Sequence, residues 1–149
     1  MKKLLCALCM FLSLVACDKQ DNPNNKLVVK IGIMLPLSGD YAAHGDAAKR
    51  ILKIVKEDIK NAKNHYEFML EDSGTDTSKA ATIIRKLVFT DKINAVTGYI
   101  SSTAMVVAPI AQENKIPSIF FVSAPEASIG EYNFRLYPDI AKAAKMISQ

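Results

Sequence analysis

The stretch Leu27-Val-Val-Lys-Ile-Gly-Ile-Met-Leu35, followed by Pro36-Leu-Ser-Gly-Asp40, decides the fold class. The first part is apolar and β-branched at nearly every position, which is typical of a strand buried on both faces of a parallel sheet. The Pro-Leu-Ser-Gly-Asp segment then ends the strand. Residues 46–61 follow with apolar side chains at helical spacing and lysines elsewhere, which predicts an amphipathic helix.

The same alternation of strand and helix continues to the end of the chain. Asp76 or Thr77 is placed to cap the second helix, and Pro109 should kink the third or remove one of its hydrogen bonds. Short connectors between these segments predict parallel strands, right-handed crossovers and helices on both faces, a three-layer αβα fold in the α/β class. The further predicted strands are 66–70, 95–97, 117–122 and 134–136, and the further helices are 77–90, 102–114 and 139–148.

In such folds the ligand site lies outside the carboxyl ends of the strands. The candidate loops are therefore residues 36–45, 98–102 and 123–126. The sequence has no Gly-x-Gly-x-x-Gly after the first strand, no P-loop and no Gly-x-Ser-x-Gly elbow. His44 and His65 are its two histidines, and neither lies in a cluster with metal-ligand spacing. We therefore predict a protein that is not an enzyme and uses no cofactor or metal, with His44 lining or edging a pocket.

Ser101-Ser102-Thr103 follows a predicted strand and opens a predicted helix. Hydroxyls and free backbone N–H groups meet at such a helix start, and the helix dipole adds partial positive charge there, so a carboxylate would bind well. A serine at this place is also a routine helix cap. Both interpretations stay open, and Ser101 could cap the helix while Ser102 binds a ligand.

Aromatic residues near the candidate loops have two interpretations each. Tyr41 lies in the first loop and would either cover a ligand or stand at the rim of the pocket. Phe120 and Phe121 are predicted to belong to the core rather than to the site.

The amino terminus has the pattern of a lipoprotein signal peptide. Two lysines precede an apolar run of about a dozen residues, too short to span a bilayer. The run ends in Leu14-Val-Ala-Cys17, which matches the lipobox of bacterial lipoproteins. We predict a signal peptide over residues 1–16, lipidation of Cys17 and a flexible tether over residues 17–26. The alternative is an ordinary signal peptide with a chance cysteine.

Removal of the signal peptide would also remove Cys6, Cys9 and two lysines. Lipid would consume Cys17, so residues 27–149 would fold without a disulfide or a free thiol. The formal net charge would fall from +4 to +2, which is too small a positive charge to indicate nucleic-acid binding. The membrane contact expected for this chain is the lipid anchor.

Several of these stretches resemble type I periplasmic binding proteins, in particular the Leu/Ile/Val-binding receptors of ABC transporters. The resemblance covers residues 27 to about 139. It rests on five motifs in the family's order: Ile31-Gly-Ile-Met-Leu-Pro-Leu-Ser-Gly39 with Tyr41-Ala-Ala-x-Gly45, Glu71-Asp72-x-Gly74, Val96-Thr-Gly-Tyr-Ile-Ser-Ser-Thr103, Ala108-Pro-Ile-Ala-Gln-Glu-Asn114 with Ile116-Pro117, and Phe134-Arg-Leu-Tyr-Pro138.

The resemblance implies a receptor for an amino acid or similar small carboxylate that docks on an ABC permease. By the motif, Ser102 would hold the ligand carboxylate, with Ser101 and Thr103 beside it. Ser123 and Ala124 fall in the loop that the family uses for the ligand's ammonium and carboxylate. Ala124 stands where the family often has threonine, so either Ser123 substitutes or the grip on an amino acid is weaker.

Family members are more than twice as long, so residues 27–149 would form an amino-terminal lobe, and we expect a fragment or one part of a split protein. Some envelope lipoproteins of the same fold resemble activators of cell-wall synthases, which is the alternative function. Asp18, next to the lipidated cysteine, resembles an inner-membrane retention signal. The expected location is therefore the periplasm, anchored to the inner membrane.

Overall fold

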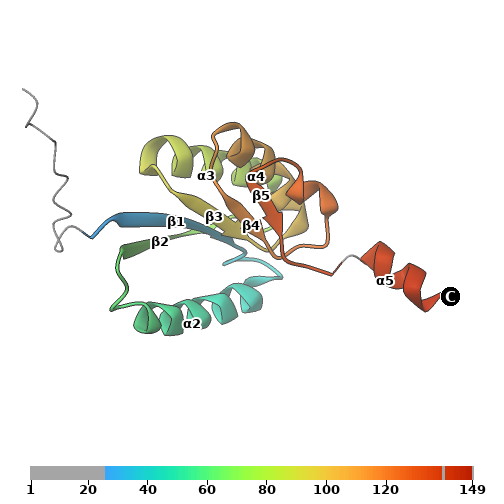
Figure 1. Cartoon of the computed structure of the whole chain (residues 1–149), viewed down its shortest axis with the longest axis horizontal. Helices are drawn as coiled ribbons and strands as arrows, with labels where there is room; N and C mark the ends of the chain where they lie inside the picture. The colour runs from blue at the N-terminus through green and yellow to red at the C-terminus, as the bar shows by residue number, and fades with distance from the viewer. Residues whose placement is uncertain (1–25, 139, 149) are drawn as a thin grey trace, which may run out of the picture.

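The computed structural model describes residues 26–138 and 140–148. The predicted signal peptide, Cys17 and all of the predicted tether except Lys26 lie outside the described residues. Within them, one parallel sheet lies between helices on its two faces, so the predicted αβα architecture is confirmed (Figure 1). No helix in this part of the chain is long and apolar enough to cross a bilayer.

The sheet has five parallel strands in the order β2-β1-β3-β4-β5. Ile33 on β1, the strand beside the edge strand β2, lies next to Leu70 of β2 and Thr97 of β3. The fourth strand is shorter than the predicted 117–122, because only residues 118–120 pair with both neighbours. The strands are β1 (Val28–Leu35), β2 (His65–Asp72), β3 (Ala95–Gly98), β4 (Ser118–Phe120) and β5 (Asn133–Arg135).

The helices match the predicted ones except at their ends. The second predicted helix is an α-helix that continues as a π-helix and ends where Lys92 takes a left-handed backbone conformation with φ of +56°. Asp76 is its cap, since its carboxylate accepts a hydrogen bond from the Lys79 amide at 3.0 Å. The third helix continues through Pro109. The elements are α2 (Ala42–Asp58), α3 (Thr77–Arg85), η2 (Lys86–Asp91), α4 (Ser101–Glu113), η3 (Pro125–Ser128) and α5 (Ile140–Ile147).

The start of α2 corrects one prediction. Residues 42–45 were expected in the first site loop, but they form the first turn of the helix. Ala42 and Ala43 are strong helix formers, and Tyr41 stands at the N-cap position. His44 is therefore held on a helix rather than on a loop.

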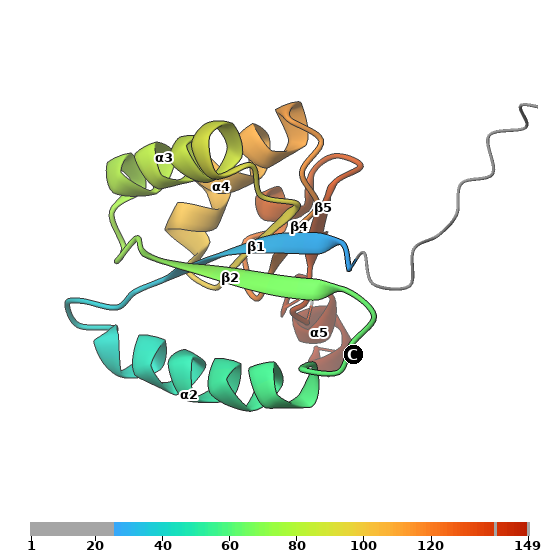
Figure 2. The same cartoon turned by 90° about the vertical axis from the view of Figure 1, so that its left-hand side faces the viewer.

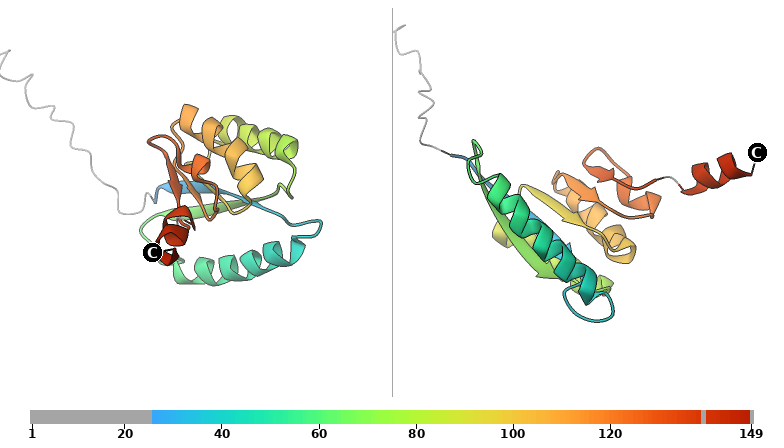
Figure 3. Two further views of the ribbon diagram at one scale, coloured as in Figure 1. Left: turned by 90° about the vertical axis from the view of Figure 1, so that its right-hand side faces the viewer. Right: turned by 90° about the horizontal axis from the view of Figure 1, so that it is seen from below.

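The two faces of the sheet are covered unequally. The helices α3 and α4 lie on one face, and α2 lies alone on the other, under β1 and β2 (Figures 1, 2 and 3). Phe120 points into the core beneath α4 and is 1% exposed, as predicted. Phe121 was predicted to be core as well, but it is 53% exposed. It emerges on the side of α2, where no second described helix covers the sheet.

The core between the sheet and α3 and α4 also contains a polar pair. Ser118 on β4 and Asn133 on β5 are buried, and the Ser118 hydroxyl donates a hydrogen bond to the Asn133 side-chain oxygen at 2.6 Å. The apolar side chains of this core include Ile84, Leu87, Val96, Val107, Phe120 and Val122.

Candidate functional site

A pocket of about 650 Å³ lies where the chain leaves the carboxyl ends of the first three strands. This is the place predicted for an α/β fold. Two of the three candidate loops contribute to it, and the loop after β2 contributes Thr75, which the sequence analysis did not single out. The lining residues are Tyr41, His44, Thr75, Tyr99, Ile100, Ser101 and Ser102.

The start of α4 forms the polar wall of the pocket. Ile100 is the N-cap residue and no side chain caps the helix, so the interpretation of Ser101 as a cap is wrong. Ser101 and Ser102 are the first two helical residues, and amides at such positions have no partner within their helix. Thr103 is 4% exposed, and its hydroxyl donates to the Ile100 carbonyl at 3.0 Å. Thr103 thus turns inward, whereas Ser101 and Ser102 line the pocket.

Three aromatic rings follow one another across the pocket. The ring centres of Tyr41 and His44 are 6.0 Å apart, and those of His44 and Tyr99 are 5.9 Å apart. Tyr41 is 48% exposed, so it lines the pocket and stands at its rim at the same time. This arrangement offers flat apolar surface beside the polar helix start.

The Tyr99 hydroxyl is buried and has no hydrogen-bond partner among the described residues. Burial, with a smaller effect from the neighbouring Tyr41, raises the pKa of Tyr99. The hydroxyl therefore keeps its proton and can donate to a ligand. Tyr99 was missed as a site residue, although its position directly after the strand β3 was the available signal.

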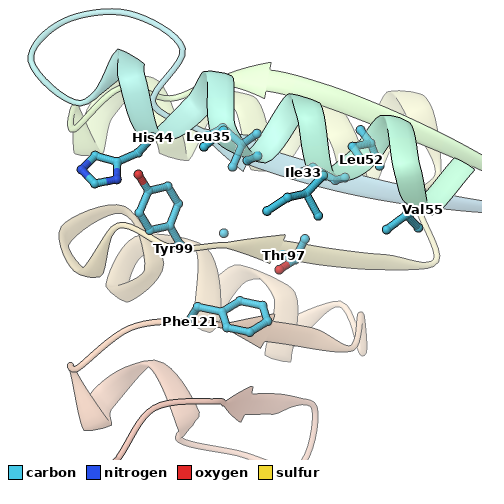
Figure 4. A pocket seen from close by; sticks show the side chains of 12 residues that line it. Ile33, Leu35, His44, Leu52, Val55, Thr97, Tyr99 and Phe121 are labelled. Carbon is cyan, nitrogen blue, oxygen red and sulfur yellow. The ribbon is translucent and has the colours of Figure 1, made fainter.

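A second, apolar cavity of about 570 Å³ lies between α2 and the sheet. Figure 4 shows Leu52 and Val55 of α2 facing this cavity across from Phe121, with His44 and Tyr99 at one end. His44 and Tyr99 line both cavities, so they stand between the polar pocket and the apolar one.

Ser123 and Ala124 are not among the residues that line either cavity. Ser123 is exposed, and its carbonyl accepts a hydrogen bond from Arg135 at 3.3 Å. Ala124 is the N-cap residue of η3. Within the described residues no group of three or more His, Cys, Asp or Glu side chains is arranged to hold a metal ion.

Asp72, at the end of β2, accepts several hydrogen bonds beside the pocket. The Ser38 hydroxyl and the Lys79 ammonium donate to one carboxylate oxygen at 2.6 and 3.0 Å. The amides of Leu37 and Gly74 donate to the other at 2.8 and 3.1 Å. The bond from Ser38, with those from Lys79 and the two amides, holds the pKa of Asp72 well below its usual value, against the opposing effect of burial.

This shift predicts a pH-dependent difference in stability between the wild type and Asp72→Asn. A depressed pKa stabilises the fold fully above the unfolded value of about 3.9, and the effect is lost as the pH falls toward the folded value. The wild type should be the more stable form at pH 7, and its advantage should shrink by about 1.4 kcal/mol per pH unit below about pH 4. Urea unfolding at several pH values measures this. An advantage that stays constant between pH 4 and pH 2 would contradict the assignment.

The sequence profile that describes the periplasmic binding protein family matches residues 28–148 of this chain. The chain belongs to this family. Its members are solute-binding proteins rather than enzymes. A comparison with curated protein sequences finds no match.

Solved structures of this family share the fold. A leucine-binding protein from Thermotoga maritima is 27% identical with a TM-score of 0.70, and the match covers 79% of this chain and 35% of that one. A branched-chain amino acid binding protein from Streptococcus pneumoniae, in complex with isoleucine, is 24% identical with a TM-score of 0.64 and coverages of 74% and 33%. A solute-binding protein of an ABC transporter from Rhodopseudomonas palustris, in complex with 3,4-dihydroxybenzoic acid, is 20% identical with a TM-score of 0.66 and coverages of 74% and 31%.

The chain thus spans about a third of the length of these solved relatives. The fold matches the type I periplasmic binding proteins of the Leu/Ile/Val-binding group, so the resemblance seen in the sequence is confirmed.

Proposed function

We propose that this chain provides the amino-terminal lobe of an extracytoplasmic solute-binding lipoprotein of an ABC transporter, whose ligand is an amino acid or a related small carboxylate. The observation that carries the proposal is the uncapped start of α4, where Ser101 and Ser102 line a pocket at the carboxyl ends of the strands. The ligands named for the similar structures, isoleucine and 3,4-dihydroxybenzoic acid, both contain a carboxylate.

The chemistry of the pocket fits a carboxylate with an apolar body. The amides and hydroxyls at the start of α4 donate hydrogen bonds, and the helix dipole favours negative charge at that end. The rings of Tyr41 and Tyr99 offer apolar surface beside this polar wall. A single lobe leaves much of a ligand in water, so we expect it to bind weakly without a second lobe to close over the ligand.

Replacing Ser102 with alanine should weaken binding by about 1–3 kcal/mol, because the ligand carboxylate would lose a hydrogen bond. The melting temperature should stay nearly unchanged, since Ser102 does not cap the helix. Calorimetric titration of the full chain with leucine, isoleucine and benzoate measures the affinity.

The matched control is Ser78→Ala, because Ser78 holds the same second position in α3 but does not line the pocket. It should leave the affinity unchanged. A large fall in stability with unchanged affinity in Ser102→Ala would instead assign Ser102 a structural role.

Lipidation and location are part of the proposal and rest on the sequence. Cells grown with labelled palmitate should incorporate the label into the wild-type chain and not into Cys17→Ser. Cell fractionation should place the chain in the inner membrane, beside the proposed permease. Recovery in the outer membrane would contradict the role assigned to Asp18.

A thermal-shift screen with carboxylates tests the receptor role directly. A ligand that binds the folded state raises the melting temperature, and the stabilisation grows with the logarithm of its concentration relative to its dissociation constant. Since a single lobe should bind weakly, the screen is run up to the solubility limit of each ligand. If no amino acid or aromatic carboxylate shifts the transition even there, the alternative of a protein-binding envelope lipoprotein is favoured.

A further inference from the structure

The ladder between β1 and β2 ends at the pocket. Its last paired residues are Leu35 and Asp72, and the Ser73 amide donates to the Leu35 carbonyl at 3.0 Å just beyond them. Pro36 follows Leu35 and has no amide hydrogen, so it cannot extend the ladder. From this point the backbones of the two strands separate into the loops that line the pocket.

Beyond the last backbone pair, the Asp72 side chain forms the hydrogen bonds that connect the two loops. One of its oxygens accepts from the amide of Leu37, the first amide after Pro36, and also from the amide of Gly74 in its own loop. The other accepts from the Ser38 hydroxyl and from Lys79 on α3. One carboxylate therefore connects the loop after β1, the loop after β2 and the first helix that follows β2.

These connections lie close to the pocket residues. Ser38 lies three residues before Tyr41, and Gly74 directly precedes Thr75. Tyr41 and Thr75 line the pocket from the two different loops. Gly39 and Gly74 have φ of +75° and +51°, and a Cβ atom added at either would meet no other atom within 4 Å, so no neighbour packs against the loops at these two points.

We propose that Asp72 is a positioning residue, whose carboxylate holds the Tyr41 loop and the Thr75 loop together and thereby sets the shape of the ligand pocket. The role in ligand binding rests on the proposed function, whereas the role in fixing the two loops does not. Asp72 itself is not among the residues that line the pocket, so it acts through the loops.

The neighbouring residue provides a matched control. Glu71 is the last residue of β2 but one, and it also accepts a hydrogen bond from a lysine, Lys86, at 2.6 Å. Lys86 in turn donates to Asp91 at 3.0 Å. None of these three residues lines the pocket, and their network joins β2 to η2. If the loss of any carboxylate near this strand end loosened the loops, Glu71→Gln and Asp72→Asn should do so equally. An effect seen in Asp72→Asn alone therefore belongs to the bonds of Asp72.

Hydrogen exchange of backbone amides in the full chain tests the positioning without any ligand. In Asp72→Asn the amides of Leu37 and Gly74 and those of residues 38–41 should exchange at least ten times faster than in the wild type. Core amides of β3 and α4 should change no more than they do in Glu71→Gln. If the loop amides exchange equally fast in both variants, Asp72 does not position the loops. Ser38→Ala removes the shortest of the four bonds and gives a second, milder variant with the same expected direction.

Titration with leucine and with benzoate then tests the link to binding. Whichever of the two ligands the wild type binds, Asp72→Asn should bind it at least ten times more weakly, whereas Glu71→Gln should keep the wild-type affinity. Faster loop exchange with unchanged affinity would overturn the role in binding. If neither probe binds any form while the loop exchange still responds to Asp72→Asn, the positioning of the loops stands and the proposed function fails.

Discussion

Replacing Gly45 with alanine should destabilise the chain by about 3 kcal/mol or more. Gly45 lies in the first turn of α2 and is buried against the end of β1. A Cβ atom at this position would collide with the backbone carbonyl of Pro36 and approach a Leu37 methyl group within 2.9 Å. A flexible side chain could move away, but the Pro36 carbonyl belongs to the backbone that leaves β1. Either the helix or the loop must shift.

The matched control for this substitution is Gly39→Ala. Gly39 lies in the same loop with φ of +75°, but a Cβ there meets no atom within 4 Å. Gly39→Ala should therefore lower the free energy of unfolding by about 1–2 kcal/mol, the cost of placing an alanine in the left-handed conformation. Thermal and urea unfolding of both variants measure the difference. Equal losses would show that the contact between Gly45 and Pro36 is not tight.

The Gly45 variant should also change the candidate site, because His44 precedes Gly45 and stands between the two cavities. A shift of the α2 start moves His44 and Tyr41 away from Tyr99. The intrinsic fluorescence of the tyrosines should therefore change even in the fraction of the variant that stays folded. An unchanged spectrum in a destabilised variant would mean that the strain is relieved elsewhere.

The parallel sheet could be predicted from the sequence because its strands are short apolar runs separated by amphipathic segments. The first strand, predicted at residues 27–35, was placed within one residue, since a long apolar and β-branched run has few alternatives to a strand. The start of α2 was not predicted, because Gly45 and the nearby Gly39 indicate a loop. A glycine in a first helical turn is understood only once the close contact with Pro36 is seen.

The position of the pocket was predicted from the sequence, but only some of its lining residues were. Topology locates ligand sites at the carboxyl ends of parallel strands, so Ser101, Ser102 and Tyr41 were found. Topology does not say which side chains of those loops turn inward. Thr103 turned into the core, whereas Tyr99 and Thr75 joined the pocket. Phe121 was misplaced because a run of apolar residues does not show how much of a sheet face its helices cover.

Replacing Asn133 with alanine should destabilise the chain by about 3–5 kcal/mol, because two buried polar groups and one part-buried carbonyl would lose a partner at once. The Asn133 amide nitrogen donates to the carbonyls of Ala108 and Ile129 at 3.1 and 2.7 Å. Its oxygen accepts from the Ser118 hydroxyl at 2.6 Å. One side chain thus connects β5 with β4, with α4 and with the segment after η3.

The local reference is Asn114→Ala, since the Asn114 side-chain amide donates to a carbonyl of its own helix, that of Ile110, at 2.8 Å. That substitution should destabilise by about 1 kcal/mol. Urea unfolding followed by far-UV circular dichroism compares the two variants.

A double-mutant cycle separates the buried network from a simple loss of packing. In Ser118→Ala the hydroxyl is gone, so the further change Asn133→Ala no longer leaves a buried donor without an acceptor. The double variant should therefore be more stable than the sum of the two single losses predicts, by about 0.5–3 kcal/mol. Strict additivity would mean that the bond between Ser118 and Asn133 contributes nothing, and that the remaining stabilisation by Asn133 comes from its bonds to the two carbonyls. Those two bonds fix the edge strand β5 to α4 and to the segment after η3, so β5 should exchange its amides faster than β3 in every variant that lacks Asn133.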